Sequence, residues 1–257
     1  MGRRVPQNRS SQWLGQHFLK SPELAKSLVQ QSNISSSDLV VEVGAGDGIL
    51  TKELARRAAQ VVAVEIDPSL AIALVQRFSE DQKVLVVIGD FFDFPLPARG
   101  FRVFGNIPFD KTTRLLRYLL DVTGGLLFRA DLIVQRGVAI KRARRWNLQN
   151  LCWAPWWDFT ITARIASRSF RPPPSVDAAL LTISKRTTPL LPEQETAQFV
   201  RFAHAAWPAA DVKTAMRQLL PARRLHDISR QLGFSPSASP INLREHQWIA
   251  LYRARSD

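Results

Sequence analysis

The sequence predicts a doubly wound, mostly parallel α/β sheet followed by a small all-helical domain. Three observations support this prediction. Short apolar runs alternate with amphipathic segments from Pro22 to Val134, a glycine-rich turn follows the first apolar run, and the strand pattern stops near Leu191, where helical periodicity takes over. Alternating strands and helices are typical of a parallel sheet with helices on both faces.

Local sequence features predict where each helix and strand lies. Ser21 can cap a helix whose first residue is Pro22, and short apolar runs that end at glycine or acidic residues indicate buried parallel strands. The expected elements are helices over Pro22–Gln31, Gly48–Ala59, Pro68–Phe78 and Thr112–Leu120, and strands over Leu39–Val43, Val61–Val64, Val84–Ile88, Phe101–Phe104 and within Leu126–Val134. Phe159–Ile165 and Ala178–Ile183 follow as closing strands. No helical pattern connects them, so we expect an antiparallel hairpin.

The last part of the chain reads as helices interrupted by proline and glycine. The expected helices are Glu193–Trp207, Val212–Leu220, Leu225–Leu232 and Leu243–Ala254. We therefore divide the chain into a basic N-terminal segment (1–20), an α/β domain (21–190) and a helical domain (191–257).

The formal net charge of +13 indicates a polyanionic partner, and nucleic acid is the leading candidate because Lys and Arg neutralise phosphates. The only cysteine, Cys152, cannot form an internal disulfide and fits a reducing compartment. There is neither an apolar run of about 18 residues nor the apolar core of a signal peptide. We expect a cytoplasmic protein, with a monomer as the default.

The positive charge is concentrated in segments that contain no acidic residue. One is the start of the chain, with Arg3 and Arg4, and another is the segment from Arg136 to Trp146. In the second, cations accompany an aromatic residue, a combination that suits single-stranded RNA. The candidate RNA-binding residues are Arg3, Arg4, Lys141, Arg142, Arg144 and Arg145. A third basic region runs from Lys213 to Arg230.

Asn106-Ile107-Pro108-Phe109 follows an apolar strand and precedes a predicted helix. The side chain of Asn106 and a peptide carbonyl beside Pro108 can accept hydrogen bonds, while Phe109 offers a stacking face. This combination suits a planar ring that carries an amino group, such as adenine. In isolation the same residues also occur in ordinary turns.

A second candidate site is the loop Gly44-Ala45-Gly46-Asp47-Gly48, between the first strand and the next helix. Glycines there let a nucleotide-like cofactor approach the backbone. Glu65 follows the second strand, 21 residues after Gly44, which is the spacing of a carboxylate that accepts ribose hydroxyls. The early third glycine and Asp90, which can hold an adenine amine beside Phe91, favour S-adenosylmethionine over a dinucleotide.

These motifs occur in the order seen in rRNA adenine N6-methyltransferases, which the chain resembles over roughly residues 12–185. The motifs that carry the resemblance are Gly15–Leu19, Glu42–Gly48, Glu65–Asp67, Gly89-Asp90, Asn106–Phe109 and Phe170–Val176. Ile107 and Phe109 look more like the Erm group, which modifies 23S rRNA. The resemblance implies a Rossmann-like methyltransferase sheet, S-adenosylmethionine as cofactor, one adenine of 23S rRNA as target, and resistance to macrolides, lincosamides and streptogramin B.

Family roles then map onto matching positions. The resemblance implies a catalytic set of Asn106, Ile107, Pro108, Phe109 and Phe170, in which the two phenylalanines stack on the target base. It implies a cofactor-binding set of His17, Leu19, Gly44, Gly46, Glu65, Ile66, Asp90, Phe91 and Asn106. The family often has Asn where His17 stands, and commonly has an acidic residue where this chain has Gly137.

Two other functions remain open from the sequence: a small-subunit (16S) rRNA adenine dimethyltransferase, and a noncatalytic RNA-binding factor on the same fold. The number of methyl groups added, and whether naked rRNA or an assembly intermediate is the substrate, are also open. His204, His226 and His246 lack ligand spacing, so we expect no metal.

Overall fold

The computed structural model describes residues 16–122, 126–144 and 147–255, so the predicted RNA contacts Arg3, Arg4 and Arg145 lie outside the described residues. Two compact units are formed. The first comprises the described residues up to Ala143 together with Phe159–Ser184, and the second the described residues of Arg144–Asp158 and Lys185–Asp257. No helix among the described residues is both long and apolar enough to cross a bilayer.

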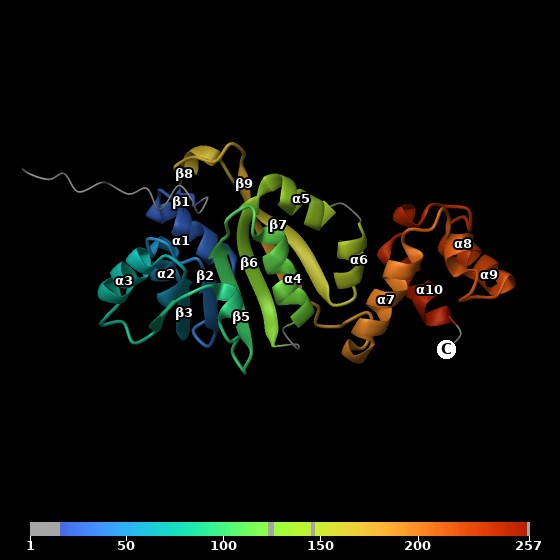
Figure 1. Cartoon of the computed structure of the whole chain (residues 1–257), viewed down its shortest axis with the longest axis horizontal. Coiled ribbons are helices and arrows are strands. Elements are labelled where there is room, and N and C mark those ends of the chain that lie inside the picture. The colour runs from blue at the N-terminus through green and yellow to red at the C-terminus, as the bar shows by residue number, and fades with distance from the viewer. Residues whose placement is uncertain (1–15, 123–125, 145–146, 256–257) are drawn as a thin grey trace, which may run out of the picture. The chain divides into compact units, whose positions relative to one another are not determined.

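The first unit is built on a seven-stranded sheet with the order β4-β3-β2-β5-β6-β9-β7 (Figure 1). Its strands are β2 (Leu39–Val43), β3 (Gln60–Glu65), β4 (Val84–Ile88), β5 (Phe101–Asn106), β6 (Leu127–Gln135), β7 (Trp157–Ile165) and β9 (Ala178–Lys185). The pairs β2–β3, β3–β4, β2–β5 and β5–β6 are parallel, whereas β6–β9 is antiparallel. The predicted mostly parallel sheet is confirmed, and β7 and β9 are neighbours, as expected of the closing strands.

Helices cover both faces of this sheet, with α1 and α2 on one face and α4 and α5 on the other (Figure 1). The helices of the first unit are α1 (Pro22–Gln31), α2 (Ile49–Ala55), α3 (Pro68–Arg77), α4 (Thr112–Val122) and α5 (Arg136–Arg144). Ser21 caps α1 as predicted, since its side chain accepts from the amide of Leu24 over 3.1 Å. The apolar residues Leu28 of α1 and Leu54 of α2 pack with Phe104 in one buried core.

Two short strands were not predicted from the sequence. β1 (Phe18–Leu19) pairs antiparallel with β8 (Phe170–Arg171), with Leu19 opposite Phe170. Two-residue strands carry no periodicity, so only the pairing itself defines them. This pairing holds the segment that precedes α1 against the loop that precedes β9.

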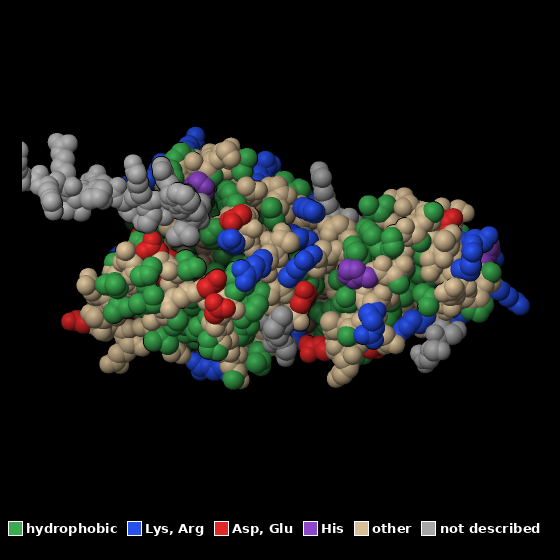
Figure 2. All heavy atoms as spheres, in the orientation of Figure 1, with side chains coloured by type: hydrophobic (Ala, Val, Ile, Leu, Met, Phe, Trp, Pro, Cys, Tyr) green, Lys and Arg blue, Asp and Glu red, His purple; other side chains and the backbone are tan. Residues whose placement is uncertain are grey.

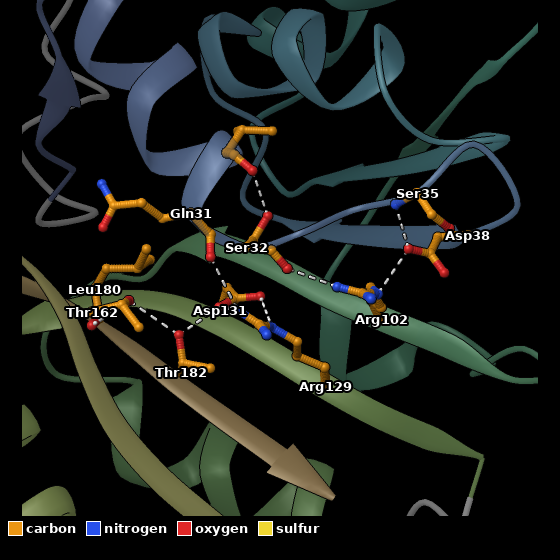
Figure 3. Close-up of polar contacts among 11 residues, drawn as sticks. Gln31, Ser32, Ser35, Asp38, Arg102, Arg129, Asp131, Thr162, Leu180 and Thr182 are labelled. Atoms are coloured by element: carbon orange, nitrogen blue, oxygen red, sulfur yellow. Dashed lines mark hydrogen bonds and ion pairs between the residues drawn. The ribbon is translucent and has the colours of Figure 1, made fainter.

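A buried polar network lies at the amino ends of β5 and β6 (Figure 3). Arg129 binds Asp131 with two hydrogen bonds of 2.7 and 3.0 Å, and Thr182 donates to the same carboxylate over 2.6 Å. Arg102 pairs with Asp38 over 2.9 Å and donates to the carbonyl of Ser32, just after α1. Burial raises the pKa of Asp131, and these partners offset that cost. The network joins the end of α1 to the sheet.

The second unit is helical and has its own aromatic core. Its elements include α6 (Leu148–Trp153), α7 (Thr196–Ala206), α8 (Val212–Met216), α9 (Ala222–Leu232) and α10 (Glu245–Ala254). The ring of Phe199 packs edge-on against Tyr252 at 5.1 Å and Phe202 against Trp248 at 5.9 Å. Arg186 pairs with Glu245 over 3.0 Å. The four predicted helices are confirmed, while α6 was not predicted.

The close approach of β5 to β2 yields a stability prediction. A Cβ at Gly105 would lie 2.6 Å from the backbone oxygen of Val43 and 2.9 Å from Ile107. We expect Gly105→Ala to destabilise the first unit by about 1–3 kcal/mol, the usual cost of overpacking. The measurement is the denaturant dependence of hydrogen exchange in peptides of β2 and β5.

Gly137→Ala is the matched control, because a Cβ there has nothing within 4 Å and Ala is favoured over Gly in helices by about 1 kcal/mol. Equal protection in Gly105→Ala and the original chain would contradict the prediction.

Candidate active site

One pocket gathers segments that are far apart in the sequence. It is lined by residues of the β1 segment, the glycine loop after β2, the end of β3 and the segment after β5. The lining residues are Gln16, His17, Phe18, Leu19, Gly44, Ala45, Gly46, Asp47, Ile49, Leu50, Glu65, Ile66, Asn106, Ile107, Pro108 and Phe109. The pocket therefore lies at the carboxyl ends of parallel strands, where open α/β sheets bind ligands.

The glycine loop takes a shape that other residues would strain. Gly44, Gly46 and Gly48 all have positive φ, between 59° and 77°. A Cβ at Gly48 would meet Leu74 at 2.6 Å, and one at Gly46 would meet the ring of Phe18 at 2.9 Å. Packing as well as conformation thus requires glycine at these positions.

Glu65 holds this loop from the end of β3. Its side chain is buried, and its two carboxylate oxygens accept from the amides of Gly46 over 2.8 Å and Asp67 over 2.9 Å. Charged acceptors that receive backbone N–H groups form strong hydrogen bonds. Each oxygen keeps a second lone pair, so the carboxylate can also receive a hydroxyl from the pocket.

Asn106 ends β5 with its amide group fixed. Its Nδ2 donates to the backbone carbonyl of His17 over 2.6 Å. A carbonyl can only accept, so this bond defines which end of the amide is nitrogen. Oδ1 is therefore the atom left to accept a hydrogen bond from a ligand.

The catalytic residues predicted from the sequence are only partly brought together. Asn106, Ile107, Pro108 and Phe109 all line the pocket, and Phe109 is half-buried. Phe170 is fully buried in the core beside Leu19 and does not line the pocket. The structure therefore does not present Phe170 to a stacking base, because its ring fills the space between β8 and the sheet.

Of the predicted cofactor-binding residues, most line the pocket and two do not. His17, Leu19, Gly44, Gly46, Glu65, Ile66 and Asn106 line the pocket. Asp90 and Phe91 do not: Asp90 accepts from the amide of Phe92 over 3.0 Å, and Phe91 is buried against Tyr118. Their roles remain predictions.

Gln16 was not among the predicted site residues. It lines the pocket, and its buried Oε1 has no hydrogen-bond partner among the described residues. A buried acceptor without a partner is costly and suits a ligand that brings a donor. Its position within the Gly15–Leu19 motif was the feature of the sequence that could have identified it as a site residue.

The predicted RNA-binding residues of α5 differ in exposure. Lys141 and Arg144 are exposed, but Arg142 is buried, and burial lowers the pKa of its guanidinium. The prediction that Arg142 binds RNA is corrected accordingly, since its charge lies inside the unit. Figure 2 shows further Lys and Arg side chains over α4, where Arg114 and Arg117 are exposed. Their spacing of three residues on a helix was the signal for a shared face.

Comparison with known proteins identifies the family. The model of the ribosomal RNA adenine dimethylase family matches residues 7–252. The chain belongs to this family. It is 32% identical to an rRNA methyltransferase of Streptomyces thermotolerans over 93% of this chain and 81% of that one. It is likewise 32% identical to the mycinamicin-resistance protein MyrB of Micromonospora griseorubida, over 93% of this chain and 77% of that one.

Among solved structures, the 23S rRNA methyltransferase ErmE superposes with a TM-score of 0.84 and 26% identity, covering 93% of this chain and 99% of that chain. Members of the ribosomal RNA adenine dimethylase family transfer methyl groups from S-adenosylmethionine, and this chain is such an enzyme. The pocket fits the cofactor in two respects. At Gly44 the nearest atom to an added Cβ lies 3.9 Å away, so the backbone there is open to a ligand, and Gln16 Oε1, which has no partner among the described residues, can accept from a donor such as the cofactor's ammonium group.

The free volume of the pocket, about 80 Å³, is smaller than the roughly 300–1,000 Å³ typical of small-molecule sites. Phe18 accounts for part of the difference, because its ring lies against Gly46.

Glu42, on β2 behind the glycine loop, provides a pH-dependent prediction. Its Oε2 accepts from Thr51 over 2.6 Å, while its buried Oε1 has no partner among the described residues. Burial, aided by the nearby Glu65, raises the pKa of Glu42 from 4.5 to about 8. Between these values the folded state holds one more proton than the unfolded state. The free energy of unfolding therefore falls as pH rises from 4.5 to 8, by up to about 1.4 kcal/mol per pH unit.

Glu42→Gln keeps an acceptor for Thr51 but cannot titrate, so we expect it to remove this slope. Hydrogen exchange in β2 peptides, measured across that pH range with denaturant, reports the difference. The exposed Glu80→Gln is the control and should keep the original slope. Parallel pH curves for Glu42→Gln and the original chain would refute the assignment.

Proposed function

We propose that this enzyme methylates N6 of a single adenine in 23S rRNA and so confers resistance to macrolides, lincosamides and streptogramin B. The fixed amide of Asn106 carries the proposal of adenine chemistry, because its Nδ2 is engaged by His17 and its Oδ1 is left to accept from an amino group. The 23S target is supported by Ile107 and Phe109 and by the similarity to MyrB and ErmE.

The residues after β5 can orient the amino group. Adenine N6 is a poor nucleophile because its lone pair is delocalised into the ring. If Asn106 Oδ1 accepts one N–H and a backbone carbonyl the other, the lone pair points out of the ring plane. The Pro108 carbonyl already accepts from the amide of Lys111 over 2.9 Å, which favours Ile107 as the second acceptor. Positioning and electrostatics then supply most of the rate gain.

S-adenosylmethionine supplies an activated methyl group when bound. We infer that Gly44 and Gly46 admit it to the backbone, that Glu65 receives its ribose hydroxyls, and that Gln16 accepts from its amino group. The rest of the proposed cofactor set is His17, Leu19, Ile66, Asp90, Phe91 and Asn106. Asp90 is held by the amide of Phe92 at the end of β4, two strands from the glycine loop.

The target base must leave its stack to reach the pocket, at a cost of a few kcal/mol. Phe109 is the ring we propose to offset this cost by stacking, since it is half-buried and lines the pocket. For Phe170 to take part, β8 would have to separate from β1.

We propose that the RNA lies over α4 and α5 of the α/β domain (21–190). Arg114, Arg117, Lys141 and Arg144 are exposed on these helices, and α4 begins three residues after Phe109. The helical domain (191–257) adds a second basic surface, with Lys213, Arg217, Arg223, Arg224 and Arg230 all exposed. Counterions released from the RNA phosphates account for much of the affinity of such surfaces.

Mapping methylated adenines tests the target and the catalytic role of Asn106 together. We expect mass spectrometry of rRNA from cells that express the chain to show a methylated adenine in 23S and none added in 16S rRNA. Asn106→Ala should abolish transfer but bind S-adenosylhomocysteine with nearly unchanged affinity in calorimetry. New methylation in 16S rRNA would favour the small-subunit alternative. Retained activity in Asn106→Ala would exclude the proposed role.

Charge reversal tests the RNA surface. We expect Lys141→Glu with Arg144→Glu to weaken rRNA binding about tenfold or more, and to reduce the slope of log affinity against log salt by about 2, one for each lost phosphate contact. Filter binding at several salt concentrations measures both. Lys52→Glu, on an exposed position of α2 on the other face of the sheet, makes the same kind of change and should alter binding little. Binding equal to that of Lys52→Glu would remove α5 from the interface.

A further inference from the structure

A second, open cavity lies in the first unit, at the same edge of the sheet as the active-site pocket. Its volume is about 420 Å³, and its walls are the start of α5, the turn after β7 and the segment that leads into β9. Arg136, Gly137, Ser167, Ser175 and Asp177 are among the residues that line it. Since α5 begins directly after β6, the cavity lies at the carboxyl end of the strand next to β5.

Asp177 connects the three walls of this cavity. Its backbone oxygen accepts from the amide of Arg136 over 2.9 Å, and its Oδ1 accepts from the amide of Ser167 over 2.9 Å. Ser175 lies two residues before Asp177 and follows the buried Pro174, whose ring restricts the backbone. Hydrogen bonds and a proline therefore hold the lining side chains in place.

The side chains available to a ligand in this cavity are a guanidinium and two hydroxyls. Arg136 is exposed, and its side chain has no hydrogen bond or ion pair with another described residue. The hydroxyls of Ser167 and Ser175 are also without a partner in the described part of the chain. Arginine and serine side chains are common donors to the phosphate oxygens of nucleic acids.

The charge around the cavity is positive on balance. Asp177 supplies one carboxylate, and one of its oxygens is engaged by the amide of Ser167. Lys20 and Arg168 are exposed on adjoining segments, and Nζ of Lys20 donates to the carbonyl of Arg168 over 3.0 Å. Together with Arg136, these cations favour an anionic ligand.

Gly137 leaves the space beside Arg136 open. A Cβ at this position would have nothing within 4 Å, and its φ is not positive, so neither packing nor backbone conformation requires glycine. Because Gly137 lines the cavity, a longer side chain there would extend into it. Gly137 can therefore be used to fill the cavity without disturbing the fold.

The second cavity lies close to the active-site pocket along two segments. The amide of Ile107 donates to the carbonyl of Ile133 over 3.1 Å, and Arg136 follows Ile133 by three residues, roughly 10 Å along a strand. The oxygen of Pro172 contacts His17 of the active-site pocket, and the chain after Pro172 leads into the second cavity. An RNA strand whose base enters the pocket can therefore place a neighbouring phosphate in the second cavity.

We propose that the second cavity binds a phosphate of the 23S rRNA strand that flanks the target adenine, with Arg136 as the cation and Ser167 and Ser175 as hydroxyl donors. The inference rests on the proposed function, because it requires the adenine to occupy the pocket beside Asn106 and Phe109. The bound phosphate holds the strand while the base is in the pocket. The cavity thus contributes to RNA binding and not to the chemical step.

Neutral linkages in the RNA test this site. Fragments of 23S rRNA that contain the target adenine carry one methylphosphonate each, at successive positions around that adenine. We expect one flanking position to weaken binding to the original chain about fivefold to tenfold. Arg136→Gln should weaken binding of the unmodified fragment by a similar factor, and the neutral linkage at that position should then have little further effect.

Gly137→Glu and Gly137→Ala form a matched pair. Glu places a carboxylate beside Arg136, so we expect it to weaken binding at least as much as Arg136→Gln and to remove the effect of the same linkage. Ala should preserve both. For Arg136→Gln the KM for the fragment should rise while kcat stays nearly unchanged. Unchanged binding of S-adenosylhomocysteine in calorimetry shows that each variant is folded.

Additive effects of Arg136→Gln and the neutral linkage at every position would overturn the inference, since Arg136 would then act only through its general charge. Equal losses in Gly137→Ala and Gly137→Glu would overturn it as well. An original chain that binds the fragment but transfers no methyl group to adenine would instead overturn the proposed function.

Discussion

The amide nitrogen of Asn106 donates to the carbonyl of His17 over 2.6 Å, across 89 residues of sequence. This bond joins the end of β5 to the segment that closes the pocket. Since a carbonyl accepts only, it also sets the direction of the Asn106 oxygen. The pairing of β1 with β8 and the contact of His17 with Pro172 hold the same segment from its other side. The chemistry of the pocket depends on these contacts.

Buried polar groups of the first unit lie near both ends of the sheet. At the amino ends of β5 and β6, Arg129 and Asp131 satisfy each other, and Arg102 forms an ion pair with Asp38, although its buried Nε has no hydrogen-bond partner among the described residues. At the carboxyl ends, Gln16 and Glu42 each keep a buried oxygen without a partner among the described residues. Of these two residues only Gln16 lines the pocket, where a ligand can supply the missing donor.

Much of the architecture followed from the sequence. Apolar runs predicted the parallel strands, Ser21 and Pro22 predicted the start of α1, and the end of the strand pattern predicted the helices after Leu191. The parallel topology alone brought Gly44, Glu65 and Asn106 to one edge, because parallel strands end on the same side. α5 and α6 were missed because their apolar residues show weak helical periodicity.

By itself, then, the sequence determined which motifs follow the strands at one edge of the sheet, the family to which the chain belongs, and the chemistry that the motifs can perform. Only the tertiary structure decided which predicted residues reach the pocket. It buried Phe170 in the core and also buried Arg142 of α5, and it fixed the Asn106 amide and the His17 tautomer through backbone carbonyls. Burial and hydrogen-bond direction depend on neighbours that are distant in the chain, so no local pattern can specify them.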